Sequence, residues 1–400
     1  MAASDVRARP FKQSVEEIFP HLVEMRRWFH RHPELAFHEV ETARYIIAEL
    51  ERLGIPYRYA GDGHSVIGEL ETSPGIPFVA LRAEMDALPG QELTGAPYAS
   101  EYPGRMHACG HGAHMAMVLG AAALLSEKPP PGNVRFIFQP AEEYGGGSRT
   151  AISDGALDQV VSIFAGHVTH DYESGVVMIR DGSVTAQSDR FYLRIRGESG
   201  HAARPHEATD AVLVAGTLIM TIQSLISRET NPLHPTVVTI GRIAGGTAAN
   251  VIAGEAEMEG SIRTTLPEVR AHIHAGLRRM AEAAALLHDA RVDISIQEGY
   301  PPVVNSQSEV AVAREAARSI VGEACLTMAE HPSMGSEDFS YYLKEVPGCF
   351  VRFGARPKSM EPVPLHNARF DIDEQVLKVG AAYFEEVVRR RLSPARASLG

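Results

Sequence analysis

The segment from His107 to His114 constrains the fold of this chain more than any other stretch of its sequence. It reads His-Ala-Cys-Gly-His-Gly-Ala-His, and so brings three histidines and Cys109 together as potential metal ligands. Thiolate and imidazole are good protein ligands for borderline divalent metals. Gly110 allows the sharp backbone bend with which Cys109 and His111 could both reach one metal or two adjacent ones. We therefore predict a metal site here, rather than a helix start with scattered histidines.

A helix is expected directly after this segment, because apolar residues follow at helical spacing: Met115, Val118, Leu119, Ala122 and Leu125. Cys109 would then lie just before the first helical turn. The positive end of the helix dipole is expected to lower the pKa of a thiol at that place. The prediction is a thiolate that is ready to bind a cation.

Length, charge and cysteine content restrict the class of protein. A chain of 400 residues is too long for one compact core, which favours two domains. The net charge of −12 and the lack of a long basic run argue against a nucleic-acid partner. Three cysteines do not suggest a disulfide framework. Met1 to Phe11 lacks the apolar core of a signal peptide, and we see no apolar run near the ~20 residues that span a bilayer. We expect a cytoplasmic protein with a small-molecule substrate and no membrane partner.

Strands and helices alternate through the first part of the chain. Helices are predicted over 14–30 and from Val40 to Gly54, and buried strands over 78–81, 134–138 and 161–166. This alternation is typical of an α/β sheet covered by helices on both faces.

Residues 186–298 carry a different pattern. The expected elements follow the order β-α-β-β-α-β of a ferredoxin-like unit: 191–195, 210–226, 237–241, 256–263, 267–287 and 292–296. We predict that 186–298 is an inserted α+β lid domain. Residues 1–185 and 299–400 would form the two parts of the larger, metal-binding catalytic domain.

Two carboxylates follow the predicted strand at 134–138. Glu142 and Glu143 come just after Gln139-Pro140, and ligands in open α/β sheets collect at the carboxyl ends of strands. Adjacent residues in an extended chain point in different directions. One carboxylate could therefore bind a metal while its neighbour accepts a proton, the pairing that metal-assisted hydrolysis needs.

Three further histidines are candidates. His167 ends the apolar run 161–166, and His366 precedes the last predicted helix. A single histidine in such a position is more often structural, but both become better candidates for metal ligands if the site needs more nitrogen donors. His201, in the inserted domain, could reach a substrate across a cleft or simply cap a loop.

Six motifs together resemble the M20 metallopeptidase family, in particular its amidohydrolase branch of hippurate hydrolase, N-acyl-amino-acid amidohydrolases and auxin-conjugate hydrolases. The resemblance runs from about residue 14 to 391. The motifs occur in the family's order: Arg82 to Pro89, His107 to His111, Gln139 to Glu143, Gly200 to Ala203, Ala249 to Ile252 and Gly335 to Phe339.

The resemblance implies a catalytic domain that binds one or two divalent transition metals, Mn²⁺ or Zn²⁺, and a lid that usually also forms a homodimer or higher oligomer. It implies a general acid/base, Glu142. It also implies three substrate contacts from the lid: His201, Asn250 and, more weakly, Arg263. The implied metal ligands are Cys109, His111, Glu143, His167 and His366.

The chain departs from the family pattern at two positions. Gly112 and Glu84 each stand where the family usually has aspartate. Carboxylates around a metal site orient the ligating imidazoles and tune metal affinity. We expect Gly112 to open space beside the metals.

The predicted function is divalent-metal-dependent hydrolysis of a C–N bond, namely the amide of an N-acyl or N-aroyl amino acid rather than an ordinary peptide bond. A metal-activated water would attack the carbonyl with Glu142 as general acid/base. One alternative uses the same chemistry to deaminate an electron-poor aromatic amine. Another is an inactive binding or scaffold protein with the same fold, against which the complete ligand set argues.

Overall fold

The computed structural model describes residues 12–358 and 360–393. Met1 to Phe11, where the sequence predicts no signal peptide, lies outside the described residues. The chain divides into two compact units: unit 1 contains Met1–Gly182, Val304–Glu330 and Asp338–Gly400, and unit 2 contains Ser183–Val303 and His331–Glu337. Unit 2 is thus slightly longer than the predicted insertion 186–298. It also takes in a second short segment from the part that the sequence assigns to the catalytic domain.

Unit 1 is built on an eight-stranded sheet in the order β1-β2-β6-β3-β7-β18-β8-β17. Its four central strands run parallel, and every residue of β3 and β6 is buried, as expected for strands covered on both faces. These strands are β6 (Asn133–Gln139), β3 (Phe78–Glu84), β7 (Val160–Glu173) and β18 (Gly348–Arg356). The flanking strands are β1 (Tyr57–Tyr59), β2 (Val66–Leu70), β8 (Val177–Met178) and β17 (Leu326–Thr327).

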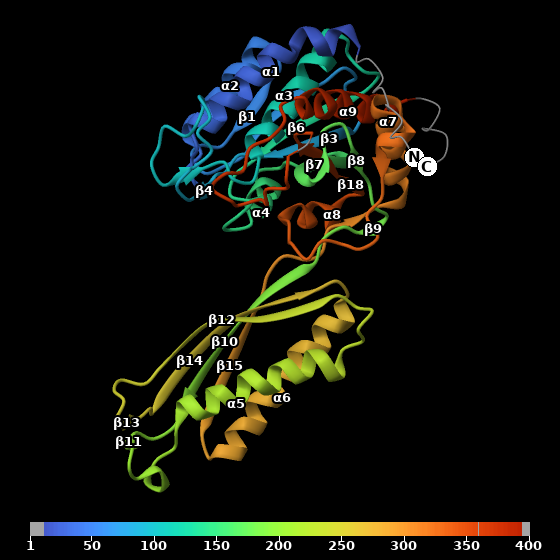
Figure 1. The fold of residues 1–400 in the computed structure, drawn as a ribbon. Helices are drawn as coiled ribbons and strands as arrows, with labels where there is room; N and C mark the ends of the chain where they lie inside the picture. Colours follow the sequence, from blue (N-terminus) through green and yellow to red (C-terminus); the bar gives the residue numbers. More distant parts are fainter. Residues whose placement is uncertain (1–11, 359, 394–400) are drawn as a thin grey trace, which may run out of the picture. The chain divides into compact units, whose positions relative to one another are not determined.

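Helices cover both faces of this sheet, so the predicted α/β fold class is confirmed (Figure 1). One face carries α1 (Gln13–Arg31), α2 (Val40–Arg52), α3 (His111–Glu127), α7 (Gln307–Val321) and α9 (Val376–Arg391). The other face carries α4 (Gly147–Ser153), η4 (Asp338–Tyr341) and α8 (Tyr342–Glu345).

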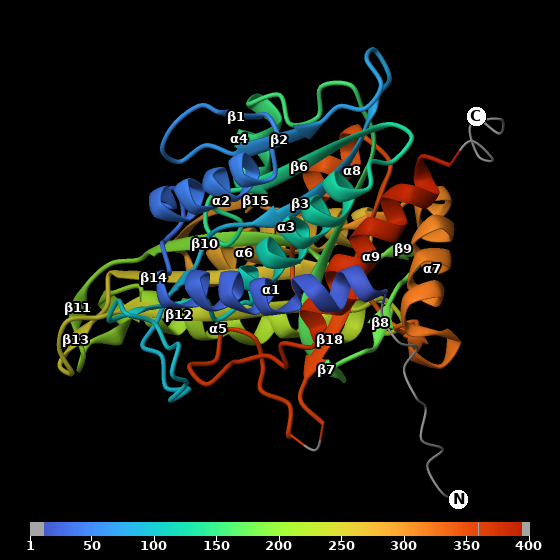
Figure 2. The same cartoon turned by 90° about the horizontal axis from the view of Figure 1, so that it is seen from above.

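Helix α3 runs between α1 and α9 across the sheet (Figure 2). It is therefore buried almost all round rather than along one stripe, and its first residue, His111, belongs to the predicted metal cluster.

Unit 2 has the predicted ferredoxin-like order, with a four-stranded sheet β12-β14-β10-β15 and two helices on one face (Figure 1). Its elements are β10 (Gln187–Arg196), α5 (Ala211–Ser224), β12 (Thr236–Gly245), β14 (Glu255–Thr264), α6 (Pro267–His288) and β15 (Arg291–Glu298). Short elements complete the chain: β4 (Leu88–Pro89), β5 (Arg105–Met106), β9 (Gly182–Ser183), β11 (Gly200–His201), β13 (Val251–Ile252), β16 (Val304–Asn305), η1 (Pro205–Glu207), η2 (Leu225–Glu229) and η3 (Glu323–Cys325).

Helix α5 corrects one expectation from the sequence. Together with η2 it forms a helix, Ala211–Glu229, with a mean hydropathy of 1.5, which by length and composition alone is enough to cross a membrane. Only a third of it is buried. One side packs on the sheet through Val214 and Leu218, while Leu213 and Met220 on the other side are 58% and 73% exposed. The helix thus has an apolar side that unit 2 itself does not cover.

A buried ion pair fastens α6 to the sheet of unit 2. The Asp189 carboxylate, at the start of β10, accepts hydrogen bonds from the Arg270 guanidinium and from His274 Nε2, the latter at 2.7 Å. Burial opposes its ionisation, yet these two hydrogen bonds hold the pKa of Asp189 below its usual value.

Substituting Asp189 should therefore destabilise unit 2. We expect Asp189→Ala to lower the free energy of unfolding by about 3 kcal/mol, because it removes the buried carboxylate that binds both Arg270 and His274. Since folding lowers this pKa, the stabilisation is present above about pH 4 and fades as the pH falls toward the folded-state pKa. Urea denaturation measures it, and Asp293→Ala, which removes an exposed carboxylate, is the control with little expected change.

Candidate active site

The predicted chemical groups of unit 1 gather at the carboxyl ends of its central strands. Asp86 follows β3, and the loop Pro140–Gly147 follows β6. Leu81 lies opposite Phe164 in the sheet, which places His167 level with Glu84 at the end of β3. The prediction that His167 ends its own strand is wrong, because β7 continues to Glu173.

Two groups of potential metal ligands share the Cys109 thiol. The first combines Cys109 with His111 and His167, and the second combines it with Glu143 and His366. Within each group the ligand atoms all lie within 4.8 Å of one another. Cys109 Sγ is 3.2 Å from His167 Nε2, and His366 Nε2 is 3.1 Å from Glu143 Oε1. The structure thus brings together all five side chains that the resemblance assigns to metal.

The histidine rings are oriented as metal ligands require. His111 Nδ1 donates a hydrogen bond to the Asp86 carbonyl oxygen at 2.8 Å, and His111 Nε2 is buried without a partner among the described residues. His167 Nδ1 donates to the Val168 carbonyl oxygen at 2.7 Å, which turns its Nε2 toward Cys109. Each ring therefore has its Nδ1 engaged by a backbone carbonyl and its Nε2 available as a ligand, and such donors fit a divalent transition metal once any proton on Nε2 is lost.

The pKa values of this site differ from the sequence-based expectation. Burial, followed by the neighbouring Glu143 and Glu142 carboxylates, raises the pKa of the Cys109 thiol well above its usual range. The expected dipole-stabilised thiolate is therefore wrong for the site without a cation. Although burial opposes it, the side chain of Asp86 and the nearby Glu84 and Glu143 carboxylates raise the pKa of His111 to about 10. The site is rich in negative charge, and a metal would favour the thiolate.

Glu142 and Glu143 lie in a turn that runs from Ala141 to Gly147, and not in extended chain. Ala141 just before them has a φ of 50°, and the Gly147 N–H closes the turn onto the Ala141 carbonyl at 3.0 Å. Consequently both carboxylates approach His111, with ligand atoms within 4.8 Å, instead of pointing apart. The Glu143 N–H donates to Asp86 Oδ2 at 2.9 Å, and Glu142 Oε1 accepts from the Asp338 N–H at 3.4 Å.

His366 reaches the site from the C-terminal part of the chain. Its φ of 66° is unusual for a residue with a Cβ, and its N–H donates to the Ala108 carbonyl oxygen at 2.9 Å. This hydrogen bond ties the loop before α9 to the residue next to Cys109. Its side chain is half exposed, so His366 lies at the solvent side of the group.

The departures at Gly112 and Glu84 have specific structural consequences. A Cβ at Gly112 would lie 3.3 Å from Phe29 Cβ in α1, so the glycine opens no space beside the metal ligands and that expectation is wrong. Glu84 Oε2 is 2.9 Å from His114 Nδ1, and His114 Nε2 accepts the Val168 N–H at 3.0 Å. His114 thus pairs with Glu84 through one ring nitrogen and fixes the backbone next to His167 through the other.

The three predicted substrate contacts of unit 2 do not lie together. His201 and Asn250 are exposed near one end of the unit, where the Ala202 N–H donates to the Asn250 carbonyl oxygen at 3.1 Å. His201 Nδ1 accepts from the Ala203 N–H, which leaves the Nε2 proton for another acceptor. Arg263 lies near the far end of β14, where it donates to Ser336 Oγ at 2.7 Å.

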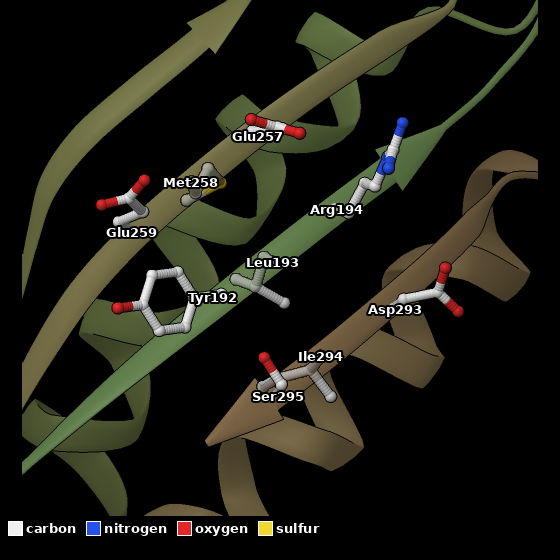
Figure 3. A pocket seen from close by; sticks show the side chains of 9 residues that line it. All are labelled: Tyr192, Leu193, Arg194, Glu257, Met258, Glu259, Asp293, Ile294 and Ser295. Atoms are coloured by element: carbon white, nitrogen blue, oxygen red, sulfur yellow. The ribbon is translucent and has the colours of Figure 1, made fainter. Parts of the chain in front are cut away.

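A shallow pocket on the helix-free face of this sheet contains none of these three residues (Figure 3). Its charged side chains pair with residues outside the pocket on neighbouring strands, as Arg194 does with Glu255 and Asp293 with Arg196. It has the character of a solvated sheet surface.

Three acidic residues that hold the site had no role assigned from the sequence. Asp86 and Asp338 lie in two of the six motifs. The Asp86 carboxylate accepts the Glu143 N–H and the backbone N–H of Asp338 donates to Glu142, and both hydrogen bonds depend on tertiary contacts. Glu39 precedes the second helix and accepts a hydrogen bond from the Ala141 N–H. The sequence offers one indication of their role: each of these residues lies beside a helix end or strand end, close to other acidic residues.

Comparisons with known proteins agree with this geometry. The model of peptidase family M20/M25/M40 matches residues 80–390. An IAA-amino acid hydrolase of Arabidopsis thaliana is 38% identical over 96% of this chain and 88% of its own length. N-acetylcysteine deacetylase of Bacillus subtilis is 38% identical over 92% of this chain and 95% of its own length.

A solved structure supports the same relationship. The YXEP protein of Bacillus subtilis, a dinuclear metal binding peptidase from the M20 family, superposes with a TM-score of 0.81 at 34% identity. The match covers 94% of this chain and 99% of that one. The chain therefore belongs to peptidase family M20/M25/M40 and, within it, to the amidohydrolase branch of metal-dependent enzymes that act on carbon–nitrogen bonds.

Proposed function

We propose that this enzyme hydrolyses the amide bond of N-acyl or N-aroyl amino acids, with Glu142 as the general acid/base. The observation that carries the proposal is the convergence of Glu142 with two groups of metal ligands that share Cys109. The relatives named for N-acetylcysteine and IAA-amino acids point to the same class of substrate.

Cys109, His111, Glu143, His167 and His366 would hold one or two divalent metals, Mn²⁺ or Zn²⁺. The thiolate favours the softer ion and the carboxylate accepts the harder one. A bound metal would supply Lewis acidity, lowering the pKa of a water and polarising the substrate carbonyl.

The protein's own groups divide the remaining work. Glu142 accepts the proton of the attacking water and returns it to the leaving amine. The Asp338 N–H holds Glu142 Oε1, while Asp86 holds the Glu143 backbone and the His111 ring. From unit 2, the Nε2 proton of His201 is suited to the developing oxyanion, and the Arg263 guanidinium to the substrate carboxylate.

The test is an assay of metal-loaded enzyme on N-acetylcysteine, N-benzoylglycine and IAA-amino acids, following release of the free amino acid. Aromatic amines are assayed in parallel for ammonia. Release of an amino acid from at least one substrate, restored by metal after chelation, is expected. Ammonia release alone would favour the deaminase alternative, for which Gly112 no longer provides support, and inactivity on both classes would favour a binding protein.

The separation of the unit 2 residues supports a homodimer. Arg263 lies eight positions after Glu255 along β14, about 27 Å at ~3.4 Å per residue, and His201 lies beyond the Glu255 end. One small substrate cannot contact Arg263 and His201 of the same chain. A second copy would supply His201 and Asn250, joined along edge strand β12 and the exposed apolar side of α5, including Leu213 and Met220.

Complementation tests this arrangement. His201→Ala and Glu142→Gln should each be nearly inactive, but mixed subunits should regain about a quarter of wild-type activity, because half of the chains pair as heterodimers with one intact site. Light scattering gives the oligomeric state. A monomer, or mixtures without regained activity after verified subunit exchange, would contradict the shared site.

A further inference from the structure

The segment Glu34–Glu39, between α1 and α2, contacts both strand ends that carry the active site. The Ala87 N–H, just after β3, donates to the Glu34 carbonyl oxygen at 2.7 Å. On the other side, the ring of Phe37 lies against Gly145, whose Cβ, if present, would be 2.5 Å from Phe37 Cε2. Phe37 itself has a φ of 62°, so this segment is held in a specific conformation.

Glu39 ends this segment with a buried carboxyl group, only 2% exposed. Its Oε1 accepts a hydrogen bond from the Ala141 N–H at 2.8 Å. Asp86 accepts the Glu143 N–H at 2.9 Å from the other side of Glu142. Two carboxyl groups therefore hold the two backbone N–H groups that flank the proposed general acid/base.

The turn held in this way is not a relaxed one. Ala141 occupies the left-handed region with a φ of 50°, a conformation that costs free energy for a residue with a Cβ. Such a conformation persists only where surrounding contacts determine it. The hydrogen bond to Glu39 falls on the N–H of that residue.

Glu39 is suited to this role as a neutral group. Burial, followed by the nearby Asp86 carboxylate, raises its pKa to about 8. At neutral pH the side chain is then mainly a protonated acid, and a glutamine would present the same oxygen acceptor with nearly the same shape.

We propose that Glu39 is a positioning residue that fixes the Ala141–Glu143 turn, and thereby places the Glu142 carboxylate for proton transfer and the Glu143 carboxylate for metal binding. This rests on the proposed function only in the role given to Glu142, since the effect on Glu143 concerns metal affinity alone.

The experiment compares Glu39→Leu, Glu39→Gln and a control, Glu309→Leu, which removes an equally buried glutamate of unit 1 on α7. For Glu39→Leu we expect kcat at saturating metal to fall about 10²-fold with KM little changed, as for a small displacement of a catalytic group. Mn²⁺ affinity, measured by calorimetry on the metal-free protein, should fall about 10-fold or more. Glu39→Gln should keep both values near wild type.

Each other result overturns the proposal. Wild-type kcat and Mn²⁺ affinity in Glu39→Leu would show that the turn does not need Glu39. Equal losses in Glu309→Leu would show a general effect of destabilisation. Equal losses in Glu39→Gln would show that the oxygen acceptor of residue 39 is not what holds the turn. If Glu39→Leu does not fold, Glu39→Asp, which withdraws the acceptor by one carbon–carbon bond, should show the same losses. If the wild type cleaves no N-acyl amino acid, the proposed function fails, while the Mn²⁺ measurements still decide the role of Glu39.

Discussion

Glu142→Gln is expected to lower kcat by about 10²–10⁴-fold while leaving the metal content at the wild-type level. The amide keeps the shape of the side chain and can still accept the Asp338 N–H, but it cannot accept the proton of the attacking water. The measurement pairs steady-state kinetics on the best N-acyl amino acid with elemental analysis of the purified protein. A variant that retains metal and loses turnover identifies the proton acceptor.

Glu143→Gln is the matched comparison, because the neighbouring residue lies in the same turn. Its carboxylate shares a ligand group with Cys109 and His366, so the neutral amide should weaken metal binding, and added metal should restore part of the activity. Metal loss from Glu142→Gln with retention in Glu143→Gln would reverse the two roles. Wild-type turnover in both variants would refute the proposed mechanism.

The second large effect is expected from the ligands at the start of α3. A Cys109→Ala, His111→Ala double variant should bind no metal stoichiometrically and should be inactive, because Cys109 belongs to both ligand groups and His111 Nε2 has no other partner among the described residues. Cys349→Ala, which removes another buried thiol of unit 1, is the control and should bind metal normally. Stoichiometric metal at wild-type affinity in the double variant would contradict the assigned site.

Metal binding to the wild type should also release protons. Burial and the two glutamates raise the pKa of Cys109, and His111 has a pKa of about 10, so both donors are protonated in the metal-free site at neutral pH. Metal must displace these protons, and its apparent affinity should therefore fall as the pH is lowered. Calorimetry in buffers of different ionisation enthalpy counts the released protons, and binding without proton release would show that these two groups are not both ligands.

The arrangement of helices and strands followed from patterns within short segments. Fully apolar runs such as 78–81 are typical of central parallel strands, and alternation along 191–195 is typical of a sheet with one face uncovered. Their order along the chain then restricted each unit to few topologies. The ligand residues were found because they stand beside these strand and helix ends, and their assignment came from the family resemblance.

What the sequence did not predict depends on contacts between distant segments. Whether a Cβ at Gly112 would meet open space or α1 depends on how closely α1 packs on α3, and no local sequence pattern contains that information. The helix dipole at Cys109 was a correct local consideration, but burial and two neighbouring carboxylates outweigh it. The hydrogen bond from Ala141 to Glu39 joins residues 102 positions apart, and neither residue has a local feature that announces the other.

The insertion of unit 2 also determines the order in which this chain can assemble during synthesis. Nearly all of unit 2 is one continuous segment, Ser183–Val303, and it can fold as soon as that segment leaves the ribosome. Unit 1 must wait, because β18 fills the gap between β7 and β8 and comes from residues 348–356. Until then one edge of β7, which is buried in the finished fold, is unpaired and exposed to solvent. Such an edge makes the nascent chain prone to aggregation. His366 emerges later still, so the full set of candidate metal ligands cannot come together before residue 366 has been made.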